Sequence, residues 1–132
     1  MRQPAAKEGD RIRATDMHIV LVPAGSARVP IPLLHRFDGI IEDGLSSNVN
    51  IMGKRAATVT SVANNRPAHT PTPPGAGFQK PPTNKGTIMT GSASVRINGN
   101  AAARNADIAM TCGDPADAPV GRVVAGGSVW IG

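Results

Sequence analysis

The sequence predicts an all-β fold made of three related hairpin units. A segment that ends in glycine and is followed by a valine–isoleucine pair recurs three times along the 132 residues. The chain also contains 15 Gly and 12 Pro residues, which disfavour helix almost throughout. A short hairpin cannot bury its own apolar face, so the units are expected to share one core. The three segments are Ile41–Gly44 with Val49–Ile51, Ile88–Gly91 with Val95–Ile97, and Val123–Gly126 with Val129–Ile131.

The first part of the chain reads as a strand followed by a proline-rich excursion. Residues 1–19 predict an opening corner and a strand, because apolar and polar residues alternate there. Residues 20–37 contain repeated prolines, which cannot donate to a ladder and predict a loop or an edge strand. Residues 66–86 are the longest irregular stretch, and long loops in compact domains are usually functional or disordered.

The hairpin units occupy the rest of the chain. The first is expected over residues 40–64 with its turn near Gly44–Asn48, the second over 87–111 and the third over 112–132. Within each unit the valine and the isoleucine are two residues apart and therefore share one face of a strand. We expect these three faces to close one core. The six residues are Val49, Ile51, Val95, Ile97, Val129 and Ile131.

Small-residue corners mark equivalent points of the three units, namely Pro4–Lys7, Arg55–Thr58 and Ala101–Arg104. A good metal ligand follows each corner at a similar distance. His18 lies 12 residues after Ala6, His69 lies 12 after Ala57, and Cys112 lies 9 after Ala103. His35 falls outside this register.

A metal site is predicted from these ligands. His18, His35, His69 and Cys112 are the complete stock of imidazole and thiol groups in the chain. Zinc takes four such ligands tetrahedrally, and iron is the rival metal. The simpler alternative is that the histidines lie on the surface and that Cys112 is a small buried apolar residue.

Catalysis is not expected. Cys112 could serve as a nucleophile with a histidine, but it precedes a Gly-Asp-Pro turn and has no protease signature around it. A zinc hydrolase would keep an open position and a general base, and Glu8 and Glu42 are the only glutamates. A closed structural site is therefore preferred over the alternative of a small zinc-dependent hydrolase or secreted effector.

The charge of the chain raises the question of nucleic-acid binding. The formal net charge is +5 and the pI about 10.4. However, the basic residues are scattered, and aromatic residues for stacking on bases make up only 2% of the chain. We therefore expect no nucleic-acid partner, and a basic nucleic-acid chaperone is the less favoured alternative. A basic surface can instead meet an acidic protein face or maintain solubility.

Cysteine content and the N-terminal sequence limit where the protein is expected. A single Cys forms no internal disulfide, residues 1–10 are polar, and the apolar run at Ile19–Ala24 is far shorter than a membrane span. The expectation is one soluble domain over residues 1–132 that is made in the cytoplasm, without excluding export by a route that needs no cleaved signal.

The corner motifs, together with the final Gly126–Gly132 segment, closely resemble the PAAR-repeat family. The resemblance implies a small cone of short β-hairpins with pseudo-threefold symmetry and long Pro/Gly-rich loops. It also implies a structural tip protein on a trimeric β-helical spike of a type VI secretion system, a related contractile injection system or a phage tail. A zinc ion near the apex of the cone would stiffen the tip for membrane puncture. By this resemblance the zinc ligands are His18, His35, His69 and Cys112.

The resemblance also implies partners and a location. One copy is expected per spike trimer, with assembly in the bacterial cytoplasm and export at the tip of the particle. The target membrane and a possible effector cargo are further expected contacts. Because only threefold-equivalent positions meet a threefold partner equally, the docking face is predicted at the glycine-serine segments, opposite the metal. The predicted docking residues are Gly44, Ser46, Gly91, Ser92, Gly126 and Ser128.

Overall fold

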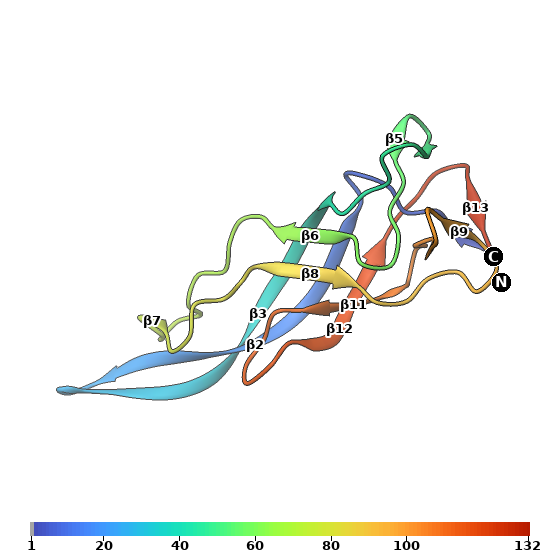
Figure 1. The fold of residues 1–132 in the computed structure, drawn as a ribbon. Helices are drawn as coiled ribbons and strands as arrows, with labels where there is room; N and C mark the ends of the chain where they lie inside the picture. The colour runs from blue at the N-terminus through green and yellow to red at the C-terminus, as the bar shows by residue number, and fades with distance from the viewer. Residues whose placement is uncertain (1) are drawn as a thin grey trace.

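The computed structural model of the protein describes residues 2–132 and contains thirteen β-strands (Figure 1). The described residues form no helix, so none is present that is long and apolar enough to cross a membrane. The all-β prediction is confirmed. The strands are β1 Gln3–Pro4, β2 Arg11–Ala24, β3 Ala27–Asp43, β4 Asn50–Ile51, β5 Lys54–Arg55, β6 Val62–Asn65, β7 Gly77–Phe78, β8 Lys85–Ile88, β9 Arg96–Ile97, β10 Asn100–Ala101, β11 Ile108–Thr111, β12 Ala118–Val124 and β13 Trp130–Ile131.

Six of these strands close into a small antiparallel barrel. The order β12-β11-β8-β6-β3-β2 returns to its start because β12 also pairs with β2, and β7 adds to the outer edge of β2. Closure leaves no free edge around the barrel itself. Burial alternates along the short strands β6, β8 and β11, as expected when every second residue faces the interior. The main core comprises Ala6, Ile12, Phe37, Ile41, Ala57, Ala63, Ile88, Ala103, Ala109, Cys112 and Val123.

Three two-stranded hairpins lie at one end of the barrel, and we call this the threefold end. They are β4–β5, β9–β10 and β1–β13. The last of them is made from the two ends of the chain, where Gln3 pairs with Ile131. Figure 1 shows β5, β9 and β13 and both termini at the same end of the molecule.

The tight turns of two hairpins correct one prediction from the sequence. The chain reverses at Met52–Gly53 and at Asn98–Gly99, where both residues of each pair have positive φ. This is the conformation of a two-residue type I′ turn. The first turn was expected near Gly44–Asn48, but those residues instead connect β3 to β4.

A closed ring of backbone contacts relates the three units. Lys7 bridges Ala56, Thr58 bridges Ala102, and Arg104 bridges Ala5, so that each unit contacts the next. Within this ring the N–H of Ala6 donates to Ala103, that of Ala103 to Ala57, and that of Ala57 back to Ala6, at 2.9–3.0 Å. The three alanines are fully buried. The ring is pseudo-threefold in one chain.

A second apolar cluster lies under the three hairpins, as predicted from the valine–isoleucine pairs. Each unit contributes one isoleucine and one alanine, and Val49 and Val95 pack against the cluster. Val129, the third valine of the set, is instead 39% exposed. The cluster comprises Ala5, Ile51, Ala56, Ile97, Ala102 and Ile131.

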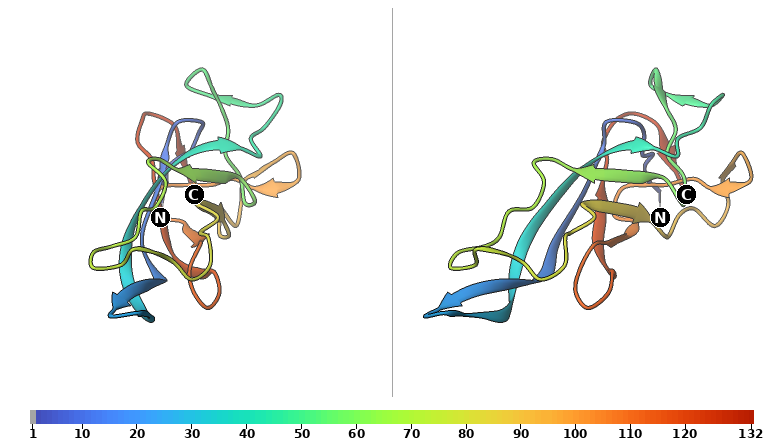
Figure 2. Two further views of the ribbon diagram at one scale, coloured as in Figure 1. Left: turned by 90° about the vertical axis from the view of Figure 1, so that its left-hand side faces the viewer. Right: turned by 60° about the vertical axis from the view of Figure 1, so that its left-hand side comes forward.

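The predicted loop over residues 20–37 is wrong, and the edge-strand alternative is right. β2 and β3 pair continuously from Arg11–Ile40 to Ala24–Ala27 and form a long hairpin that extends away from the barrel (Figure 2). Pro30 and Pro32 fit because their positions face the free edge of β3, where the ladder to β2 needs no donor. Residues 66–86 are largely irregular, as expected, with only the short strand β7 and the start of β8.

Candidate metal centre

Four side chains from three parts of the chain meet inside the molecule, between the barrel and the long hairpin. Asp16 and His18 lie on the inner face of β2, His69 lies in the loop after β6, and Cys112 directly follows β11. One ligand atom from each lies within 4.8 Å of the others. Asp16, His18 and Cys112 are at most 2% exposed.

The carboxylate of Asp16 links the members of this cluster. Its Oδ2 accepts a hydrogen bond from Nε2 of His69 at 2.9 Å and from the Cys112 thiol at 3.5 Å. Its Oδ1 accepts a hydrogen bond from the Thr111 hydroxyl. The Cys112 sulfur also lies 3.6 Å from Nε2 of His18. Asp16 was not among the sequence-predicted ligands, although its position two residues before His18 places both on one strand face.

Two asparagines hold His69 in place. The Asn65 amide lies 3.3 Å from Nδ1 of His69, and Oδ1 of Asn84 accepts the backbone N–H of His69 at 2.8 Å. Because the amide donates to Nδ1, the ring proton is on Nε2, which faces the carboxylate of Asp16. Asn84 has a positive φ of 58°, which asparagine tolerates better than most residues. Neither asparagine was predicted as a site residue from the sequence.

His35 lies beside the cluster and bonds elsewhere. It pairs directly with Asp16 across β2 and β3, and its ring centroid is 5.4 Å from that of His18. Its Nδ1 contacts the Leu33 carbonyl at 2.9 Å, and its Nε2 accepts the N–H of Thr72 at 3.0 Å. Since the carbonyl only accepts and the amide only donates, His35 is neutral with its proton on Nδ1. The structure thus brings together three of the four predicted ligands, with Asp16 in the fourth place.

Burial shifts the pKa values of several groups in and beside the cluster. Desolvation, followed by the charge of His69, lowers the pKa of His18, and desolvation also lowers the pKa of His35. Burial, with the neighbouring Asp16 carboxylate, raises the pKa of the Cys112 thiol to about 11. The imidazoles of His18 and His35 are therefore neutral near pH 7, while the Cys112 thiol must lose its proton to become a ligand.

His18 has an unsatisfied nitrogen that suits a metal-binding histidine. Within the described part of the chain, Nδ1 of His18 is buried without a hydrogen-bond partner, and Oδ2 of Asp114 lies 3.6 Å from it. Asp114 is in turn held by the N–H of Ile19 at 2.9 Å and by Lys80 at 3.3 Å. Burial raises the pKa of Asp114, but these two donors outweigh it and lower the pKa overall. Histidines that bind metals commonly have a carboxylate beside the ring nitrogen that does not contact the metal, where it fixes the orientation of the ring.

The donor set fits a transition metal of zinc's type. Two imidazoles, a thiol and a carboxylate are all groups that zinc accepts in a four-ligand site. His18, His69, Cys112 and Asp16 would hold it, with Asp114 orienting His18. The metal would thereby cross-link β2, the loop 66–86 and the end of β11.

The predicted docking residues all lie at the threefold end, on the segments that connect the barrel strands to the hairpins. Ser46 and Ser92 are buried there, with 6% and 3% of their surface exposed. Their hydroxyls accept the N–H groups of Val49 and Val95 at 2.9 Å and so shape the approach to the hairpins. Gly44, Gly126 and Ser128 are exposed, and Gly91 is half-buried.

Comparison with known proteins identifies the family. A family model for the PAAR motif matches residues 35–116, which is more than half of the chain. No curated protein and no solved structure matches the sequence. The PAAR family is a structural one, and its members are associated with the spike tips of secretion and injection systems. The family match and the three corner motifs of the buried ring agree, and the chain belongs to the PAAR-motif family.

Proposed function

We propose that residues 1–132 form a single tip domain that caps a trimeric β-helical spike of a contractile injection machine, one copy per trimer. The observation that carries this proposal is the closed ring of three equivalent backbone contacts. A monomer that covers a threefold face must present three similar surfaces, and the ring places three hairpins in that relation.

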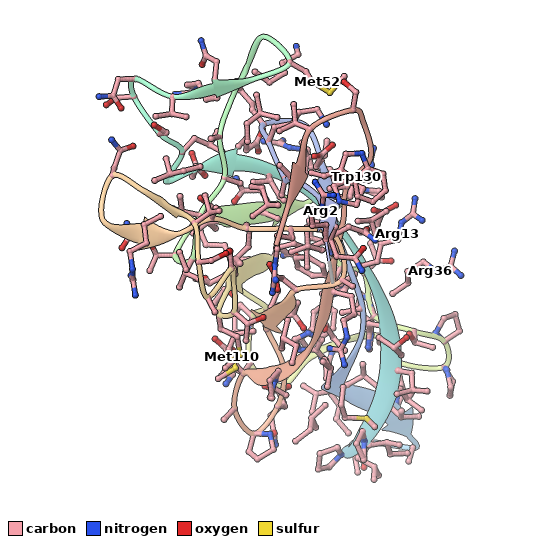
Figure 3. The ribbon with its side chains drawn as sticks, turned by 90° about the vertical axis from the view of Figure 1, so that its right-hand side faces the viewer. Arg2, Arg13, Arg36, Met52, Met110 and Trp130 are labelled. Carbon is pink, nitrogen blue, oxygen red and sulfur yellow. The ribbon has the colours of Figure 1, made fainter. Side chains whose placement is uncertain are left out.

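The threefold end supplies a suitable docking face. Met52 and Trp130 lie at this end together with Arg2 (Figure 3), and both are more than half exposed. Large exposed apolar side chains are typical of surfaces that bind protein partners. The last strands of a β-helical trimer have unpaired backbone groups, and a cap that covers them also removes an aggregation hazard.

The metal stiffens the opposite part of the molecule in this proposal. Zinc binding would contribute folding free energy to a domain whose two cores are small and rich in alanine. Burial of the cluster favours a closed structural site over a hydrolytic one, because a substrate needs access to the metal. X-ray absorption spectroscopy of the zinc-loaded protein should show four protein ligands and no water on the metal.

The cellular setting is part of the same proposal. We place assembly in the bacterial cytoplasm, followed by export at the tip of the particle. Contact with the target membrane on puncture, and carriage of an effector, belong to the same proposal.

Light scattering of the protein mixed with the spike of the same injection system tests the cap. The complex should have one cap per three spike chains, and the protein alone should be a monomer. Ser128→Arg and Met52→Asp should weaken binding at least tenfold while zinc content is unchanged. Val120→Asp, an equally exposed apolar position on β12, is the matched control. A homotrimer of the protein alone, or equal losses in all three variants, would refute the proposal.

A further inference from the structure

The distal part of the long hairpin is apolar on both faces. Residues 19–34 contain one charged residue, Arg28, and no Asp or Glu. Residues 27–32 are all exposed, and Val29 and Ile31 are 41% and 36% exposed. These two side chains share a face with Val20 and Val22, whereas Pro30 and Leu34 lie on the other face. An antiparallel strand with one face on a protein core and the other in water has polar residues on its outer face. The apolar residues on both faces of this hairpin therefore require another explanation.

The rest of the protein covers only the base of this hairpin. β7 pairs with Val20 and Leu21, and the Thr72 hydroxyl donates to the Leu34 carbonyl on the other edge. Beyond these contacts each arm extends about four more residues to the turn at Gly25–Ser26, roughly 13 Å at about 3.3 Å per residue. Figure 2 shows this part of β2 and β3 projecting past the body of the molecule.

Prolines remove the donors from both free edges. The carbonyls of Ile19 and Leu21 accept N–H groups from the segment 76–79, so this set of β2 positions faces outward. Backbone groups alternate between the two edges of a strand, so Pro23 also faces the edge of β2 on which β7 lies. The residues paired with Ile19, Leu21 and Pro23 on β3 face the opposite, outer edge of the hairpin. They are Pro32, Pro30 and Arg28. The outward positions 23, 30 and 32 therefore have no N–H that would require a partner.

From these observations we infer that the hairpin tip, residues 22–31, inserts into the interfacial region of a lipid bilayer that contains anionic lipid. Missing donors lower the cost of leaving water, and apolar side chains on both faces gain by it. The outward carbonyls still need partners, which the headgroup layer supplies and the hydrocarbon core does not. The free length of the arms suits burial to the headgroup and acyl boundary, about 5–10 Å deep.

The positive charge of the hairpin tip favours a surface that carries negative charge. Arg28 is exposed next to the turn, and with no carboxylate in residues 19–34 the tip is purely cationic. An acidic protein groove would also attract one arginine, but it would leave the apolar residues around the whole hairpin in water. A bilayer covers both faces at once. The inference uses the proposed function only for its setting, since lipid binding can be measured without a spike.

Co-flotation of the zinc-loaded protein with vesicles of phosphatidylcholine and phosphatidylglycerol is the first test. The protein should float with these vesicles, and Val29→Asp combined with Ile31→Asp should lower the bound fraction at least fivefold. Val124→Asp, a comparably exposed position on β12, is the control and should bind as the parent does. Arg28→Gln should lose up to roughly fivefold in affinity for the anionic vesicles only. Melting temperature and zinc content confirm that each variant is folded.

Tryptophan fluorescence tests the orientation. Trp130 is the only tryptophan and lies at the threefold end. Vesicles with brominated acyl chains should leave its emission unquenched. In the variant Trp130→Phe with Val29→Trp, the new side chain should shift to the blue and be quenched.

Three results would overturn the inference. They are failure of the parent protein to float, equal binding by the Val29→Asp/Ile31→Asp and Val124→Asp variants, and quenching of Trp130 in place of the residue at position 29. A dimer that is seen by light scattering and abolished by Val29→Asp would instead assign the tip to a second copy. Spike binding by the Val29→Asp/Ile31→Asp variant should be unchanged, so a failed cap proposal is distinguishable from a failed lipid inference.

Discussion

The two ends of this molecule are built on different principles. At the threefold end three short hairpins repeat one arrangement, and each alanine of the central ring has two counterparts. Toward the other end the symmetry is lost, because one hairpin is far longer than the others and the ligands come from unequal positions. Under the proposed cap function, symmetry is retained where the chain would meet a threefold partner, and the chain diverges where no such partner would be met.

The largest effect is expected from loss of the metal at the asymmetric end. Cys112→Ser should abolish stoichiometric zinc and lower the Tm by more than about 10 °C, because structural zinc can contribute several kcal/mol to folding. Elemental analysis and calorimetry check both. Chelator-treated parent protein is the control and should melt close to the variant. Retention of zinc and Tm by the variant would show that Cys112 is not a ligand.

The identity of the fourth ligand comes next. Asp16→Ala should weaken zinc binding by about 10–100-fold, because Asp16 contacts two of the other cluster members. His35→Gln should cost less than threefold, since both nitrogens of His35 are already hydrogen-bonded to Leu33 and Thr72. Competition with a chromogenic chelator measures both. The reverse order would assign the site to three histidines and one cysteine.

The central ring gives a test of the symmetry itself. Ala6→Val, Ala57→Val and Ala103→Val should each lower the free energy of unfolding by about 2 kcal/mol, because extra methyl groups overpack a fully buried position. Denaturant titration checks this. Ala24→Val, at the exposed end of β2, should change little. Widely different losses at the three ring positions would mean that the units are equivalent in backbone only.

The corners should show a smaller effect. In each unit a side chain accepts the backbone N–H three residues earlier, as Asp107 does for Arg104 at 2.7 Å and Ser61 does for Thr58 at 2.9 Å. Asp107→Ala and Ser61→Ala should each cost about 1–2 kcal/mol, since the N–H loses its partner. Denaturant titration again provides the values, with Asp117→Ala on an exposed loop as the control. No loss at either corner would show that water replaces the side chain.

The smallest effect on folding is expected at the prolines of the long hairpin. Pro30→Val with Pro32→Val should leave the Tm within a few degrees, because these positions do not donate to β2. The variant should nevertheless associate over time, since it restores N–H groups along a free apolar edge. Light scattering at increasing concentration follows this, with Pro82→Val in the irregular loop for comparison. Lasting monodispersity would argue that the edge is protected in another way.

Much of the symmetric end could be predicted from the sequence, and less of the other end. Residue spacing predicts which side chains share a strand face, so the buried isoleucines Ile51, Ile97 and Ile131 followed from it. The Asn98–Gly99 pair is a strong local signal for a two-residue hairpin turn. Residues 20–37 could be predicted only as a loop or an edge strand. Proline excludes a central strand but is compatible with an edge strand, and the local sequence does not show which strand edge is free.

The candidate metal centre could also be predicted only in part from the sequence. His18 and His69 each follow a corner alanine by 12 residues, and this spacing indicated both as ligands, although one lies on β2 and the other in the loop after β6. The position of Asp16 in the cluster, and the hydrogen bonds that engage both nitrogens of His35, depend on contacts that only the folded chain provides. The supporting roles of Asn65 and Asn84 have no sequence signal of their own, because asparagine in a loop most often shapes a turn.

The hairpin made from the two ends of the chain also has a consequence for folding during synthesis. β1 is translated first, yet its partner β13 comprises residues 130–131, so this third hairpin cannot form until residue 131 has left the ribosome. Contacts of such large sequence separation slow folding. The long β2–β3 hairpin, whose contacts are local, can form early and nucleate the barrel. The threefold end is then the last part of the described chain to be completed, and under the proposed cap function docking would have to wait for this step.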